Sequence, residues 1–157
     1  MTSELSGRCA CGNVRYEIQS EPLVTQACHC RDCQRATGSA FVMHIIVCEK
    51  DFRITGETHM GFGPTGSGTG CELHSCASCG VLIWVRYKYH KVPVIAVRAG
   101  TLEDPEAVTP QAHIFTSRKL PWVLLPVEVP SFEEGIERSQ VWSKESIERY
   151  ESLPRLG

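Results

Sequence analysis

Residues 7–18, GRCACGNVRYEI, contain both a pair of closely spaced cysteines and the pattern of a β-strand. Cys9 and Cys11 place two thiols one residue apart, and an extended strand would direct both side chains to the same face. From Val14 to Ile18, apolar residues then alternate with charged ones, which is the period of a half-buried strand. The stretch therefore predicts half of a metal site that leads directly into a β-sheet.

A second pair of cysteines can complete this site. Residues 76–80, CASCG, form a Cys-x-x-Cys turn that brings two sulfur atoms to one point, and Gly80 can adopt the left-handed conformation that such turns favour. Four reduced core cysteines are the alternative, but free cysteines have no reason to cluster with this spacing. We expect a closed tetrahedral site for one structural zinc ion, with the ligands Cys9, Cys11, Cys76 and Cys79.

A third cluster, CHCRDC at residues 28–33, places three more thiols within one short segment. Three thiolate ligands and one vacant position are the pattern of catalytic zinc. We therefore expect a second zinc ion, held by Cys28, Cys30 and Cys33. The alternative is a second structural site, whose fourth ligand is water or one of the residues Cys71, Cys48 and His29.

Neighbours of the third cluster are candidate substrate contacts. His29 lies between two ligands that share a strand face, so we expect it to point away from the metal ion, where it can orient a substrate. Three thiolates around Zn²⁺ leave a net negative charge, and a bound substrate thiolate would increase it. Arg31 and Arg35 follow closely in the sequence, and we expect these two cations to balance that charge.

The composition fits one globular domain, with 157 residues, a formal net charge of −2 and nine cysteines. This charge does not indicate the basic surface that binds nucleic acid, so we expect small-molecule partners. The first residues lack the pattern of a signal peptide, and no apolar run approaches the roughly 20 residues that span a bilayer. We expect a cytoplasmic protein without a membrane partner, whose cysteines bind metal rather than form disulfides.

The rest of the chain favours short strands over helices. Apolar or β-branched stretches occur at residues 41–48, 81–85, 92–97 and 113–116. The best helical pattern covers residues 143–150, and one further turn is expected at residues 33–37. We expect a mainly β fold, with small packed sheets around the four-cysteine site and a short C-terminal helix.

The C-terminal tail and a glycine-rich segment each have two possible roles. We expect a zinc-binding domain over residues 5–135 and a tail over residues 136–157 that either docks on this domain or joins a dimer contact. The tail residues available for this contact are Trp142, Ile147 and Tyr150. The glycine-rich segment 61–70 lacks the ending of a phosphate-binding loop, so we expect a mobile connector, with a flap over a ligand as the alternative.

The motifs and their order resemble the glutathione-dependent formaldehyde-activating enzyme family, which also contains centromere protein V. The resemblance extends from about Gly7 to Gly135. It rests on the segments Gly7–Gly12, Cys28–Ser39, Cys76–Gly80, Gly100–Leu102, Lys119–Trp122 and Pro130–Gly135.

This resemblance implies a mainly β fold shared with methionine sulfoxide reductase B. It also implies a structural zinc ion at the outer cysteine pairs, and a second zinc ion at Cys28, Cys30 and Cys33 as the labile or catalytic set. The implied activity is that of a carbon-sulfur lyase, which condenses glutathione or a related thiol with formaldehyde or another aldehyde, and the reverse. A non-catalytic zinc-binding module is the alternative, and sulfoxide reduction would require Cys48 or Cys71 as a redox cysteine.

Overall fold

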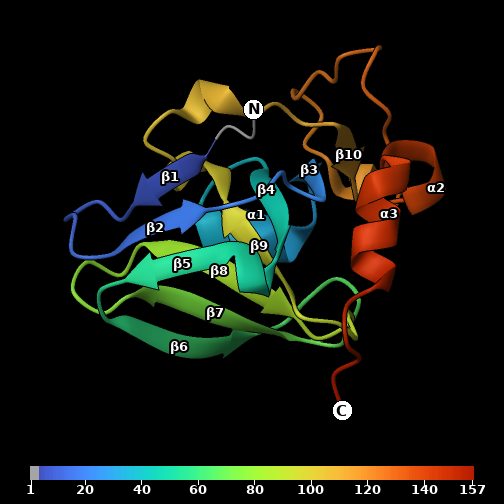
Figure 1. Cartoon of the computed structure of the whole chain (residues 1–157). Coiled ribbons are helices and arrows are strands. Elements are labelled where there is room, and N and C mark those ends of the chain that lie inside the picture. Colours follow the sequence, from blue (N-terminus) through green and yellow to red (C-terminus); the bar gives the residue numbers. More distant parts are fainter. Residues whose placement is uncertain (1–3) are drawn as a thin grey trace.

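The computed structural model describes residues 4–157, which form a mainly β fold with two sheets (Figure 1). The smaller sheet is antiparallel and has the strand order β1-β2-β5, with bounds Leu5–Arg8, Arg15–Ile18 and Phe52–Thr55. Gly7 pairs with Tyr16 in this sheet, and a Cβ atom at position 7 would lie 2.3 Å from the Tyr16 ring. Only glycine therefore fits this position.

The larger sheet has seven strands in the order β10-β3-β4-β9-β8-β7-β6. Only the β10–β3 pair is parallel among these described strands. In that order the strands are Ala112–Ile114, Val24–Cys28, Val42–Cys48, Val94–Arg98, Leu82–Tyr87, Cys71–Cys76 and Thr58–Gly63.

Three short α-helices complete the structure. Helix α1, Arg31–Thr37, begins after Cys30 and ends at Gly38, which adopts the left-handed conformation with φ 65°. Helices α2, Arg138–Val141, and α3, Lys144–Glu151, lie in the C-terminal segment. Short 3-10 turns occupy Glu49–Asp51, Ala99–Thr101, Pro105–Ala107 and Thr116–Arg118. No described helix has both the length and the apolar character needed to cross a membrane.

Two of the three buried clusters of side chains hold the sheets and the C-terminal segment together. One lies between the two sheets, where β2 residues such as Ile18 pack with β4 and β9 residues such as Ile45 and Val97. The other lies under the C-terminal segment, where Trp142 and Leu153 pack with residues of β3, β4 and β9, and where Ile147 and Tyr150 also contribute. The tail thus packs against the large sheet, as α3 does in Figure 1.

The sequence predicted some of these elements and missed others. The expected strands at 41–48, 81–85, 92–97 and 113–116 coincide with β4, β8, β9 and β10 to within a few residues. Strand β3 was missed because all its residues are buried, so it has no alternating pattern. The expected connector at residues 61–70 is wrong at its start, since residues 61–63 belong to β6 and only residues 64–70 form the turn to β7.

Candidate functional site

The outer cluster, defined as Cys9, Cys11, Cys76 and Cys79, brings together the β1–β2 turn of the small sheet and the β7–β8 turn of the large sheet. The Sγ atoms of Cys9 and Cys11 lie 3.5 Å apart, those of Cys11 and Cys76 lie 3.8 Å apart, and all four lie within 4.8 Å of one another. Four sulfur atoms around zinc at about 2.3 Å are separated by about 3.8 Å. The outer cluster therefore fits a tetrahedral metal ion.

Cys9 and Cys11 converge because of a turn and not because of a shared strand face. Cys9 and Cys11 lie in the turn between β1 and β2 rather than on a strand, so the argument from a shared strand face is wrong. The turn is closed by a hydrogen bond from the Gly12 amide to the Cys9 carbonyl, 3.2 Å, with Gly12 at φ 79°. Burial opposes ionisation of Cys9, but the Val14 amide and the neighbouring thiols lower its pKa to about 6.

The inner cluster, defined as Cys28, Cys30 and Cys33, lies where a strand ends and a helix begins. Cys28 is the last residue of β3, Cys30 caps α1, and Cys33 lies in the first turn of α1. The three side chains are buried, and their sulfur atoms lie within 4.8 Å of one another. This reversal of the chain gives three convergent ligands that could hold a metal ion.

Hydrogen bonding shifts the pKa values of the thiols of the inner cluster in different directions. Contacts from the thiols of Cys28 and Cys33 lower the pKa of Cys30 to about 2, whereas contact with Cys30 raises the pKa of Cys28. The Cys33 amide also donates to the Cys30 sulfur, at 3.3 Å. One thiolate is thus favoured at neutral pH, and a bound cation would favour ionisation of the other two.

A cavity of about 670 Å³ opens beside the inner cluster, and all three of its cysteines line this cavity. Its walls are mostly apolar and include Phe62, Phe115, Ile136 and Trp142. This volume is typical of small-molecule sites. The outer cluster does not line the cavity, so the inner cluster is the one that a substrate can reach there.

Fourth-ligand candidates for the inner cluster lie elsewhere. Among the described residues, no further Cys, His, Asp or Glu joins the three sulfur atoms in one group. Cys71 lines the cavity at the start of β7, but its sulfur contacts the Gly63 carbonyl at 3.6 Å. Cys48 is buried under the C-terminal segment.

The three expected substrate contacts occupy different places. His29 is buried, with Nε2 3.0 Å from Nδ1 of His113, and it does not line the cavity. Arg31 contacts Gln34 and lines a separate cavity. Arg35 lines the cavity of the inner cluster and pairs with Asp32 at 3.4 Å. The role of each residue stays a prediction.

The polar residues of the cavity that the sequence did not predict include Tyr87, His44 and Arg98. The Tyr87 hydroxyl lies 3.9 Å from the Cys33 sulfur and 3.1 Å from Nε2 of His44, and the Arg98 guanidinium contacts the same nitrogen. Burial raises the pKa of Tyr87 well above its usual value and lowers the pKa of His44 well below, which keeps both groups neutral.

The sequence contained a signal for two of these residues. His44 interrupts the otherwise apolar stretch VMHIIVC and Arg98 ends the apolar stretch VIAVR, and a polar residue in a buried strand needs a partner or a function. Tyr87 gave no such signal, because the segment YKYHK at residues 87–91 mixes aromatic and basic residues in a way that is typical of a solvated turn. In the structure Tyr87 instead ends β8 and lines the cavity, and His90 is buried.

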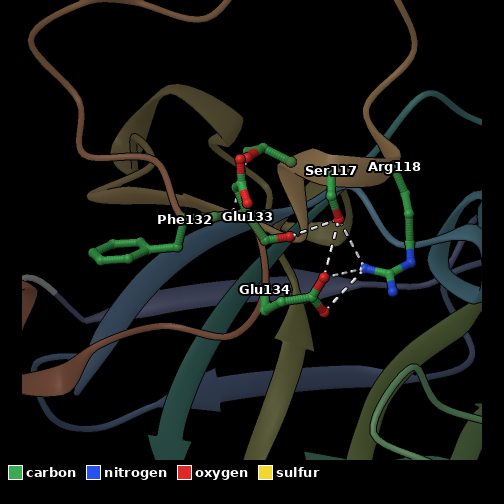
Figure 2. A network of polar contacts seen from close by, with 6 residues as sticks. Ser117, Arg118, Phe132, Glu133 and Glu134 are labelled. Carbon is green, nitrogen blue, oxygen red and sulfur yellow. Dashed lines mark hydrogen bonds and ion pairs between the residues drawn. The ribbon is translucent and has the colours of Figure 1, made fainter.

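A network of polar contacts fixes one wall of the cavity. The Ser117 hydroxyl donates to the Glu133 carbonyl at 2.8 Å, and the Arg118 guanidinium pairs with the Glu134 carboxylate at 2.9 Å, as Figure 2 shows. The Phe115 amide donates to the Glu134 carbonyl at 2.8 Å. These contacts hold Phe115, a wall residue in the left-handed conformation with φ 54°, against the segment that leads to Gly135.

Comparisons with known proteins give one family. A family model described as glutathione-dependent formaldehyde-activating enzyme matches residues 4–118, a range that contains both cysteine clusters. The crystal structure of a Rhodobacter sphaeroides protein is similar at 23% identity, covering 67% of this chain and 91% of that chain with a TM-score of 0.49. No curated protein matches.

Proposed function

The chain belongs to the glutathione-dependent formaldehyde-activating enzyme family, and on this premise we propose that it is a carbon-sulfur lyase. It condenses glutathione or a related thiol with formaldehyde or another aldehyde, and it cleaves the S-hydroxyalkyl adduct in the reverse direction. The observation that carries the proposal is the inner cluster, whose three convergent thiols face a cavity of about 670 Å³.

We propose zinc as the metal at both clusters. Four thiolates close the outer site, so its ion is structural, whereas the three thiolates of the inner site leave one position free for a substrate. Zinc bound by Cys28, Cys30 and Cys33 would lower the pKa of a substrate thiol and favour the nucleophilic thiolate.

The residues of the cavity have distinct roles in this reaction. The thiolate sulfur forms a bond to the aldehyde carbon, the carbonyl π electrons move to the oxygen, and this oxygen takes up the proton that balances the proton lost by the thiol. Tyr87 lies beside Cys33 and donates a hydrogen bond to the oxygen as its negative charge develops. The apolar walls, including Phe62 and Phe115, exclude water from the adduct.

A calorimetric titration tests this function. Zinc-loaded protein is titrated with glutathione, and adduct formation with ¹³C-formaldehyde is followed by NMR exchange measurements. We expect saturable binding and accelerated exchange, and we expect Cys30→Ser to lose both while the outer cluster stays intact. Cys48→Ser, which changes a buried cysteine outside both clusters, is the matched control. Full activity of a metallated Cys30→Ser variant would contradict the proposal.

A second candidate function, a non-catalytic zinc-binding module, is favoured by one observation. Large apolar side chains gather in an exposed segment after Arg118, where the exposed fractions are 71% for Trp122, 88% for Leu124 and 102% for Val127. Grouped exposed apolar residues mark interaction sites. A metallated protein that binds no thiol and accelerates no adduct exchange would favour this module over the lyase.

A further inference from the structure

Three polar side chains form a row across the floor of the cavity. Gln26 of β3 lies opposite His44 of β4, and His44 lies opposite Arg98 of β9, so the three occupy adjacent positions on neighbouring strands. Directly opposed residues project from the same face of a sheet. All three line the cavity, and we call them the polar row (β3, β4 and β9 in Figure 1).

The polar row is deeply buried and incompletely paired. Exposed fractions are 3% for Gln26, 1% for His44 and 6% for Arg98. Gln26 Oε1, His44 Nδ1 and Arg98 Nε have no hydrogen-bond partner, and no ion pair among residues 4–157 includes Arg98. A buried guanidinium without an acidic partner is costly to fold, so its retention in a cavity wall points to an anionic ligand.

The chemistry of the row selects the class of anion. A planar guanidinium matches a carboxylate, to which it can donate two parallel hydrogen bonds, and the Gln26 amide group on the other side of His44 can donate another. His44 is neutral and its Nε2 accepts from the Arg98 guanidinium, so it orients that guanidinium and adds no charge. The row therefore offers one cation and one amide to a single carboxylate.

Resting on the proposed function, we infer that the polar row is a carboxylate subsite that anchors the substrate of the inner cluster. Gln26 and Cys28 are two residues apart on β3 and share a face, which places the row about 7 Å along the strand from a cluster cysteine. A substrate whose carboxylate lies a few bonds from the reacting sulfur or carbon spans that separation. The substrate class is an acidic thiol or an aldehyde acid.

Two matched pairs of small ligands test the subsite by calorimetry on the zinc-loaded protein. Mercaptoacetate and 2-mercaptoethanol are thiols of similar size that differ in a carboxylate, and glyoxylate and acetaldehyde are the corresponding aldehyde pair. We expect a carboxylate ligand to bind at least 10-fold more tightly than its neutral partner. Selectivity confined to the thiol pair places the carboxylate on the thiol substrate, and selectivity confined to the aldehyde pair places it on the aldehyde.

Variants test whether the polar row causes the preference for carboxylate ligands. Arg98→Met should abolish the preference for the carboxylate ligand and change the affinity for 2-mercaptoethanol less than about 2-fold. Gln26→Glu keeps the arginine and the side-chain size, and it should also abolish the preference because the added carboxylate in the polar row repels the carboxylate of the ligand. Arg15→Met removes the same charge from an exposed side chain of β2 and is the control. Circular dichroism and zinc content verify that each variant is folded and loaded.

The alternative is that Arg98 only balances the charge of the thiolates. In that case Arg98→Met would weaken both ligands of a pair equally or release the inner zinc ion, and Gln26→Glu would not change selectivity. Either result, or equal affinities within both pairs for the unchanged protein, overturns the carboxylate subsite. These titrations measure binding and need no turnover. A protein that lacks lyase activity can therefore still show the preference for carboxylate ligands, so failure of the lyase proposal can be told apart from failure of the carboxylate subsite.

Discussion

The Sγ atom of Cys11 lies 3.8 Å from that of Cys76, although the two residues are 65 positions apart. Cys11 follows the first strand of the small sheet, and Cys76 ends β7 of the large sheet. A metal ion at the outer cluster would therefore join the two sheets, beside the hydrogen bond that Asn13 Nδ2 donates to Ser78 Oγ at 3.0 Å, and it would constrain the unfolded chain as a crosslink does.

Loss of the outer metal should unfold the protein. Structural zinc contributes on the order of 10 kcal/mol to small metal-dependent folds, so Cys76→Ser should lower the melting temperature by tens of degrees or prevent folding. Thermal denaturation with parallel metal analysis measures this effect. Cys48→Ser, in the core but outside both clusters, should retain the full metal content. A Cys76→Ser protein with unchanged stability would contradict a structural role for the outer cluster.

Removal of the Tyr87 hydroxyl should slow catalysis without weakening thiol binding. The loss of one hydrogen bond to a developing oxyanion typically costs about 10²-fold in kcat. We expect Tyr87→Phe to lower kcat by this factor and to change the glutathione affinity less than about 2-fold, since the hydroxyl contacts Cys33 and His44. Steady-state kinetics beside calorimetry separate the two effects, and the control is Tyr89→Phe, which removes the hydroxyl of a cavity residue stacked on Tyr87. Equal losses in kcat and affinity would assign Tyr87 to binding instead.

The close approach at Gly7 should make Gly7→Ala destabilising. A Cβ atom there would lie 2.3 Å from the Tyr16 ring and 2.5 Å from the Thr101 carbonyl oxygen, so backbone must move. Such overpacking costs about 1–3 kcal/mol. Urea unfolding measures the change, and Gly61→Ala on β6, where nothing lies within 4 Å, should be nearly neutral. A stable Gly7→Ala protein would show that the small sheet shifts freely against Tyr16.

Acidification should destabilise the protein through His90. Burial, assisted by the nearby Arg138, lowers the pKa of His90 to about 3 in the folded protein, below about 6.5 for the unfolded chain. The unfolded chain then binds more protons between these values, so stability is present above pH 6.5 and is lost as the pH falls toward 3.

This pH effect is measurable as a difference between proteins. Between pH 7 and pH 5, titration of His90 alone should remove about 2 kcal/mol from the free energy of unfolding. His90→Gln should reduce this loss, while it also weakens the contact that His90 makes with the Tyr150 hydroxyl at 3.1 Å. Denaturant unfolding at both pH values checks the result. Identical pH dependence of the two proteins would exclude His90 as the titrating group.

The sequence by itself determined the two groups of cysteines that could hold metal ions and the class of fold. Spacing alone separated Cys28, Cys30 and Cys33 from the two outer pairs, and the structure groups the sulfur atoms in the same two sets. Alternating stretches such as residues 15–18 indicated strands, because one face of each is buried and the other is not. These signals are local, since a turn or a strand face is specified by residues a few positions apart.

Only the tertiary structure decided what surrounds the inner cluster. Gln26, His44 and Arg98 become neighbours through the pairing of β3, β4 and β9, and Tyr87 reaches them from β8. Strand register depends on long-range pairing and on which faces the two sheets bury against each other, neither of which is written in a local pattern. The cysteines that could hold a metal ion were therefore predictable from the sequence, whereas the residues that line the cavity beside the inner cluster were not.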